Sequence, residues 1–181
     1  NMATLSALFA VKPLAGTAAA DPVATIGALE WLYAPLVGVS QIFVINSPLS
    51  GAILLGAIGI YSPRAAAFTL AGSSIGAATA LACGAPAAEI GAGLWGFNPA
   101  LTSLAVSVFF VPSMQTYALA SVSAAATAVV SGGANVAMVG AFGVPALTLP
   151  FCAVAASTHL VCQVGVPGLR FVRDGQREGP D

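Results

Sequence analysis

The stretch Glu89–Ala105, EIGAGLWGFNPALTSLA, lies in the middle of a chain that is otherwise almost continuously apolar. Three glycines fall within positions 91–96, and Asn98 and Pro99 follow them directly. Glycine weakens a helix, whereas Asn followed by Pro suits an N-cap and a first helical turn. We therefore predict a helix that ends near Gly91, a short non-helical segment, and a second helix that begins at Asn98.

The composition around this stretch is that of an integral membrane protein. Of the 181 residues, 58% are hydrophobic and 6% are charged, and the mean hydropathy is +0.95. Soluble domains carry about a quarter charged residues, so this chain has too little charge to cover a water-facing surface. Between Glu30 and Arg170, only Arg64 and Glu89 are charged. The net charge is −1 and there is no basic patch, which argues against a nucleic-acid partner.

In a lipid bilayer, irregular backbone is tolerated only where protein buries it or where it borders a wet cavity. A broken apolar segment is also a sequence indicator of a transport site. We therefore interpret Glu89–Ala105 as an element that lines a pore. Glu89 itself is interpreted as an interfacial or helix-capping residue, because a buried carboxylate would be costly and would attract cations.

The remaining apolar segments predict an all-α fold with about five transmembrane helices and one broken or re-entrant pore helix. The expected spans are Val23–Phe43, Leu49–Tyr61, Ala65–Cys83, Met114–Val130 and Pro145–Val164, with the broken element continuing to Val111. Pro63 is placed to begin a helix. Ser131–Gly133 is expected to end one helix and to leave Asn135–Val144 as a separate segment. Gly72 and Gly76 form a GxxxG pattern, which brings membrane helices together but has low specificity in a glycine-rich chain.

Outside the spans, residues 1–22 are expected to be a linker or lead-in, residues 23–166 the membrane unit, and residues 167–181 a polar tail. The tail holds Arg170, Arg173 and Arg177, which predicts a cytoplasmic C-terminus. The chain opens with Asn1 before Met2, which suggests a fragment.

Residues for catalysis or metal binding are sparse. His159 is the only histidine, and Cys83, Cys152 and Cys162 lie in apolar runs without CxxC spacing. We interpret the cysteines as small buried hydrophobic residues. No nucleophile–base pair, nucleotide motif or ion-coupling carboxylate pair is visible, so we expect neither an enzyme nor a cofactor or metal site.

Three stretches, in this order, resemble segments of the urea transporter family. They are SQIFVINSPLSGAILLGAIGIYSP (Ser40–Pro63), GLWGFNPALTSLA (Gly93–Ala105) and VPALTLPFC (Val144–Cys152). The family has two tandem halves that each carry such a set, whereas this chain has one set, and its PFC ending is similar to the C-terminal half. The chain departs from the family pattern at Ser40, usually Gly, at Val144, usually Leu, and at Pro99, usually a small residue.

The resemblance implies one half of an inverted-repeat urea channel, with the pore running between the two halves. It implies passive urea transport, a homotrimer in the plasma membrane, and the N-terminal half as a missing partner. The alternative from a different class is a truncated, non-conducting membrane subunit that assembles with full-length relatives.

Urea is flat and neutral, with N–H donors in its plane and one carbonyl acceptor. Removing its water costs several kcal/mol unless hydrogen bonds replace it. A selective pore therefore needs a narrow slot with apolar walls and a row of acceptors, and backbone carbonyls are one known source of them. The non-helical backbone of residues 93–96 is expected to supply such carbonyls.

The resemblance assigns four residues to this pore: Gln41, Phe97, Leu101 and Thr148. Phe97 and Leu101 are four residues apart and can share one helix face, as a wall or as ordinary helix packing. Gln41 supplies a side-chain oxygen near one end of the carbonyl row, or makes an interhelical hydrogen bond. Thr148 supplies a hydroxyl at the middle of the pore, or bonds back to its own helix. Pro150 lacks an N–H, which we expect to free the carbonyl of residue 146 for a ligand or water.

Overall fold

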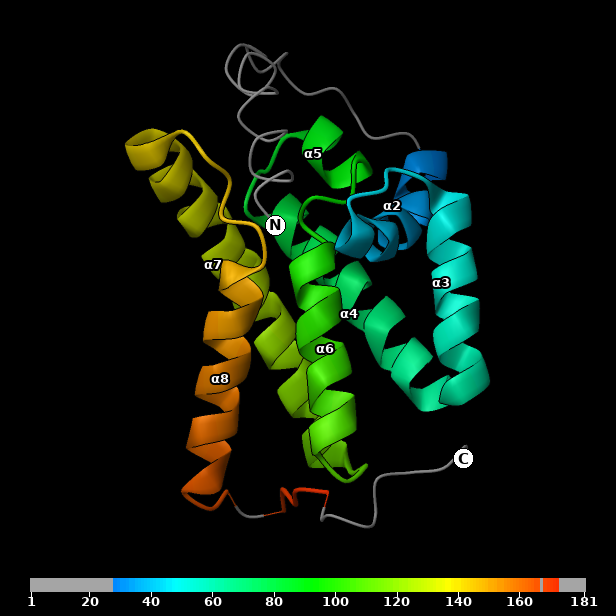
Figure 1. The fold of residues 1–181 in the computed structure, drawn as a ribbon, viewed down its shortest axis with the longest axis vertical. Helices are drawn as coiled ribbons and strands as arrows, with labels where there is room; N and C mark the ends of the chain where they lie inside the picture. The colour runs from blue at the N-terminus through cyan, green and yellow to red at the C-terminus, as the bar shows by residue number, and fades with distance from the viewer. Residues whose placement is uncertain (1–27, 167, 173–181) are drawn as a thin grey trace.

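The structure, a computed structural model, describes residues 28–166 and 168–172 (Figure 1). Its regular elements there are all helices: α2 (Ala28–Ser40), the 3-10 helix η2 (Gln41–Phe43), α3 (Pro48–Tyr61), α4 (Pro63–Ala82), α5 (Ala87–Gly91), α6 (Phe97–Phe109), α7 (Met114–Phe142) and α8 (Leu149–Gln163). The prediction of an all-α fold is confirmed. The expected lead-in, the first residues of the first span, and tail residues 167 and 173–181 lie outside the described residues.

The distribution of polar and apolar side chains is that of a membrane protein. The buried residues are mainly small, and the polar ones among them are serines, threonines and Asn98. Large apolar side chains such as Ile60, Met114 and Val164 are instead exposed. A water-soluble monomer rarely exposes apolar area on this scale, whereas lipid accepts it and small residues let membrane helices approach.

The helix lengths give fewer full crossings than the sequence predicts. In the described residues, α4 and α7 are each long and apolar enough to cross a bilayer alone. The segment Trp31–Phe43 and α3 pass the same test only as a pair bent by 75°, which brings the number to three at most. The helices α6 and α8 are apolar but have 13 and 15 residues, short of a typical span.

Serine caps fix the beginning of three helices. Ser47 precedes Pro48 and accepts a hydrogen bond from the Ser50 N–H, at 3.3 Å. Ser62 precedes Pro63 in the same way, so α4 begins at Pro63 as predicted. Ser113 caps α7. A side-chain oxygen at the N-cap satisfies an N–H that the helix leaves unpaired, and Pro suits the next position.

The predicted break at Ser131–Gly133 is wrong, because α7 runs without interruption from Met114 to Phe142. The glycine there serves close packing. A Cβ atom added at Gly132 would lie 2.5 Å from Cη2 of Trp95. The helix ends instead at Phe142 and is followed by Gly143, whose φ of 66° is a left-handed conformation that glycine adopts readily.

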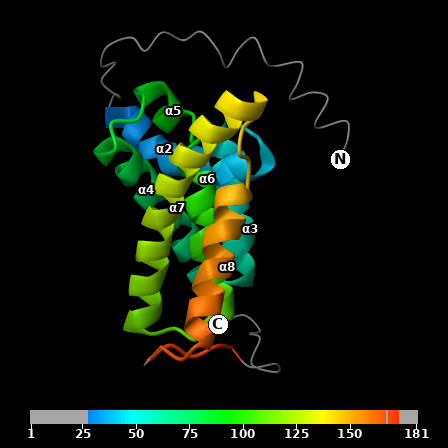
Figure 2. The ribbon, with the colours of Figure 1, turned by 90° about the vertical axis from the view of Figure 1, so that its left-hand side faces the viewer.

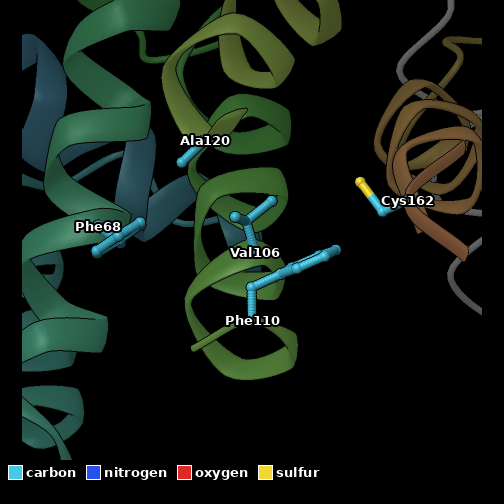
Figure 3. Packing of buried hydrophobic residues seen from close by; sticks show 5 residues of the cluster. All are labelled: Phe68, Val106, Phe110, Ala120 and Cys162. Atoms are coloured by element: carbon cyan, nitrogen blue, oxygen red, sulfur yellow. The ribbon is translucent and has the colours of Figure 1, made fainter. Parts of the chain in front are cut away.

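Helix α6 occupies the centre of the bundle, with α4 and α7 as its main packing partners (Figure 1). The GxxxG pattern of α4 faces it, since a Cβ atom at Gly72 would lie 2.5 Å from the Pro99 carbonyl and a Cβ at Gly76 would overlap the Trp95 carbonyl. Toward the other end of α6, Phe68, Val106, Phe110, Ala120 and Cys162 form an apolar cluster (Figure 3). Helices α7 and α8 run side by side beside it (Figure 2).

The residues after α8 return to the connection between α6 and α7. The N–H of Val111 donates to the carbonyl of Arg170 at 2.8 Å, and that of Val172 donates to Phe109 at 2.9 Å. The rings of Phe110 and Phe171 lie 4.6 Å apart. This pairing closes one end of the bundle.

Of the three cysteines, only Cys162 is buried, while Cys83 and Cys152 are exposed in the described chain. The interpretation of the cysteines as buried hydrophobic residues is therefore wrong for two of them. Both lie on surface that the described residues leave uncovered.

Candidate pore-lining site

The glycines before α6 permit a close approach to α2. Helix α5 ends at Gly91, as predicted, and Gly93 has a φ of 72°. A Cβ atom at Gly93 would lie 2.5 Å from the backbone N of Gly38. One at Gly96 would lie 2.6 Å from Oγ of Ser73, whose hydroxyl donates to the carbonyl of Pro35. Side chains at these positions would push the broken element away from the bundle.

Asn98 does not cap α6. The helix begins at Phe97, one residue earlier than predicted, with Gly96 at the N-cap and no side-chain capping bond. The Asn98 side chain is buried and its Nδ2 donates to the carbonyl of Leu147, at 2.9 Å. Asn98 therefore joins the start of α6 to the loop before α8, a contact that local sequence rules do not anticipate.

Phe97 and Leu101 lie one turn apart on α6, and both are partly buried. They begin a continuous apolar stripe that comprises Phe97, Leu101, Leu104, Ala105 and Val108, which we call the α6 stripe. The other faces of α6 are buried against the bundle. This central helix thus leaves one apolar face only partly covered by the described residues.

The Gln41 side chain contacts the backbone of the broken element. Its amide nitrogen, Nε2, donates to the carbonyl of Ala92 at 2.8 Å. This bond connects η2 to the residue after α5, which corresponds to the interhelical hydrogen bond considered as the alternative role of Gln41. The side chain remains partly exposed, and its amide oxygen is the part that a pore role requires.

Thr148 is exposed at the N-cap position of α8, and its side chain makes no capping bond there. Its carbonyl accepts from the N–H of Cys152 at 3.0 Å. The preceding residue, Leu147, has a φ of 51°, unusual for a residue with a side chain. Besides Asn98, Asn135 holds this loop, because its Oδ1 accepts from the N–H of Ala146 at 2.9 Å.

One expectation about carbonyl groups is wrong. The Ala146 carbonyl is not freed by Pro150, since the N–H of Leu149 donates to it at 3.1 Å and closes a tight turn. In the segment 93–96, the carbonyls of Gly93 and Gly96 accept internal bonds, from the N–H groups of Gly96 and Ala100 at 3.0 and 2.9 Å. That this segment supplies carbonyls to a pore stays a prediction.

Glu89 contacts the segment that precedes α6. It is exposed in the first turn of α5, and its Oε2 accepts from Nε1 of Trp95 at 2.9 Å. This bond braces the segment between α5 and α6. The carboxylate gives α5 a favourable negative charge near its N-terminus, without a side-chain cap.

An apolar groove of about 310 Å³ lies between α6 and α8, next to the α6 stripe. Ala105, Phe109 and Phe151 line it together with His159. The His159 ring makes edge contacts with Phe109 and Phe171, with centroids 5.7 and 4.9 Å away.

The four predicted residues thus come from three places that meet near the start of α6. Phe97 and Leu101 are on α6 itself, the bond from Asn98 to Leu147 brings the beginning of α8 with Thr148 to it, and the bond from Gln41 to Ala92 brings η2. The sequence analysis missed Asn98 as a connecting residue. The available signal was a carboxamide inside an apolar helix.

Comparison with known proteins shows the family of this chain. A sequence profile of the family described as urea transporter matches residues 1–163. The chain belongs to the urea transporter family. It is 40% identical to urea transporter 1 of Ovis aries over 129 residues, which are 70% of this chain and 33% of that relative. It is 38% identical to urea transporter 1 of Rattus norvegicus over 128 residues, again 70% of this chain and 33% of that relative.

The resemblance seen in the three sequence stretches is therefore confirmed as membership of the urea transporter family. In these matches the chain spans about a third of the length of the curated urea transporters.

Proposed function

We propose that this chain forms one wall of a passive, channel-like pore for urea. Membership of the urea transporter family supports the substrate. The observation that carries the proposal is the α6 stripe, a partly exposed apolar face on a central helix of the bundle.

The stripe has the chemistry that the faces of urea require. Urea carries its hydrogen-bonding groups in its plane, so its two faces are best placed against apolar walls. Phe97 and Leu101 begin such a wall at the start of α6. In a narrow slot the wall selects flat molecules and excludes hydrated ions, which cannot replace their water there.

Polar groups border the stripe at the same end of α6. Thr148 presents an exposed hydroxyl at the beginning of α8, and Gln41 keeps an amide oxygen beside its bond to Ala92. In the proposed pore, these two oxygens accept from urea N–H groups at the edge of the slot. Acceptors at the edge and apolar faces together offset the water that urea loses.

The proposed transport is driven by the urea gradient alone. The sequence carries no ion-coupling carboxylate pair or nucleotide motif. A neutral substrate in a slot of fixed width needs neither.

The pore as a whole requires more than this wall. We propose that a second, inverted half supplies the opposite wall, that three subunits assemble with one pore each, and that the assembly resides in the plasma membrane with its C-terminus in the cytoplasm. The second candidate function is a non-conducting subunit that assembles with full-length relatives. The span of about a third of the relatives' length keeps that candidate open.

Substitution of Phe97 tests the proposed wall. In a protein that joins this chain to a second half, Phe97→Ala should widen the slot and raise the permeability of acetamide relative to urea. Stopped-flow permeation of both solutes into proteoliposomes measures the ratio, with Phe142→Ala at the exposed end of α7 as the matched control. An unchanged ratio in Phe97→Ala would show that Phe97 packs away from the pore.

A further inference from the structure

A ladder of buried polar side chains runs along the contact between α6 and α7. These helices are antiparallel neighbours joined by a short connection (Figure 2). Thr102 of α6 and Thr127 of α7 are both buried, and their hydroxyl oxygens lie 2.9 Å apart. This bond fixes which residues of the two helices face each other.

The register set by this bond places Asn98 opposite Ser131, one turn farther along both helices. Each is four residues from its threonine, toward the start of α6 and toward the end of α7, as antiparallel helices require. The contact between Gly132 and the Trp95 ring holds the two helices together just beyond this pair. Asn98 and Ser131 are therefore bracketed by contacts on both sides.

Both residues carry a buried oxygen without a partner. Asn98 is 1% exposed and Ser131 is 2% exposed. Among the described residues, neither Oδ1 of Asn98 nor Oγ of Ser131 has a hydrogen-bond partner. Nδ2 of Asn98 is already committed to the Leu147 carbonyl. A buried polar group left unsatisfied is costly, and more so where lipid surrounds the bundle.

We infer that one buried water molecule bridges Oδ1 of Asn98 and Oγ of Ser131. The carboxamide oxygen only accepts, so the bridging species must donate, whereas the serine hydroxyl can either donate or accept. Water meets both demands with two partners. A Ca²⁺ or Mg²⁺ ion does not suit the site, because it requires about six or more oxygen ligands and favours carboxylates.

The bridge also has a positioning role. With Oδ1 bound to the water, the Asn98 amide is held in the orientation that directs Nδ2 to Leu147. Leu147 is held at a positive φ immediately before the N-cap residue of α8. The water thus links α6, α7 and the beginning of α8, and this role does not depend on which solute the protein transports.

Ser131→Ala tests the bridge by the sign of its effect on thermal stability. Loss of one satisfied hydrogen bond should lower the Tm of the detergent-solubilised protein by about 2–4 °C. If the hydroxyl were merely unsatisfied, its removal would leave the Tm unchanged or raise it. The matched control is Ser121→Ala on the exposed side of α7, where the hydroxyl bonds back to Tyr117 and a shift below about 1 °C is expected.

A density map of the unaltered protein, at a resolution that shows ordered waters, tests the same inference without any variant. The expected result is a peak within about 3.2 Å of both oxygens. A direct contact between the Ser131 hydroxyl and Oδ1 of Asn98 would overturn the inference. So would a map without a peak, or a Ser131→Ala variant as stable as the parent.

Discussion

Thr148 shows how much depends on the position of a single hydroxyl. It stands at the N-cap of α8, where a threonine commonly accepts a hydrogen bond from its own helix. Here the side chain makes no such bond and is exposed. The alternative that the hydroxyl is used up within its helix is therefore disfavoured, and the hydroxyl can interact with a passing molecule.

We predict that Thr148→Val slows urea flux about ten-fold in a protein with both halves. Valine keeps the shape and removes the hydroxyl, and one lost hydrogen bond in a dry constriction raises the barrier by roughly 1–2 kcal/mol. Stopped-flow flux normalised to reconstituted protein measures the change. The control is Thr79→Val on α4, whose hydroxyl bonds to the Ile75 carbonyl of its own helix. A Thr148→Val rate within about two-fold of the parent would remove Thr148 from the site.

The sequence identifies the residue types of the site better than their hydrogen bonds. Gln41 was expected either to supply an oxygen near one end of the carbonyl row or to make an interhelical hydrogen bond, but the sequence did not identify the partner of its amide nitrogen, the Ala92 carbonyl, which is 51 residues away. The last helix begins at Leu149 and not at Pro145 as predicted, so Pro150 lies in its first turn, and the carbonyl of Ala146 accepts from the N–H of Leu149. Such bonds depend on loops that tertiary contacts shape, so local rules do not reach them.

At the scale of the helix, local signals succeed where they act within a few residues. The Ser–Pro pairs before α3 and α4 place helix starts, because a cap and its N–H partner are neighbours in the chain. The continuity of α7 is different. Its glycine at position 132 was interpreted as a break, but it accommodates the Trp95 ring from another element. A short stretch of sequence does not distinguish a glycine that ends a helix from one that makes room for a side chain of another element.

The close packing of α4 against α6 predicts that replacing a glycine by alanine changes the Tm differently on α4 and on α3. Gly76→Ala should lower the Tm by several degrees, because its methyl group would overlap the Trp95 carbonyl. Gly56→Ala in the interior of α3 meets no described atom within 4 Å. It should leave the Tm unchanged or raise it, since Ala favours a helix over Gly by about 1 kcal/mol. Thermal unfolding in detergent compares the two variants, and equal shifts in Tm would contradict the close packing of α4 against α6 at Gly76.

At the scale of the whole molecule, composition sufficed for the membrane class and the all-α fold. It did not suffice for the number of crossings. The apolar runs Val23–Phe43 and Leu49–Tyr61 predict separate spans, but the segment from Trp31 to Phe43 and α3 form one pair bent by 75°. The apolar helices α6 and α8 are short. Hydropathy records how apolar a segment is and carries no information on how it bends within the bundle.

The central claim is that this bundle is one wall of a urea pore and conducts only with its counterpart. Alone, the chain would leave the partly exposed α6 stripe and the Thr148 hydroxyl without an opposite wall. Polar groups turned toward lipid cost several kcal/mol each, so a single wall should not sustain a pore.

Stopped-flow urea flux in liposomes tests this claim most directly, with the 181-residue chain alone compared with the same chain joined to the complementary half of a urea transporter. Circular dichroism confirms that both proteins are helical after reconstitution. For the chain alone, the account predicts urea flux no faster than that of empty liposomes. For the joined protein, it predicts rapid urea flux that requires neither an ion gradient nor a nucleotide. Rapid flux through the chain alone, or none through a folded joined protein, would contradict it.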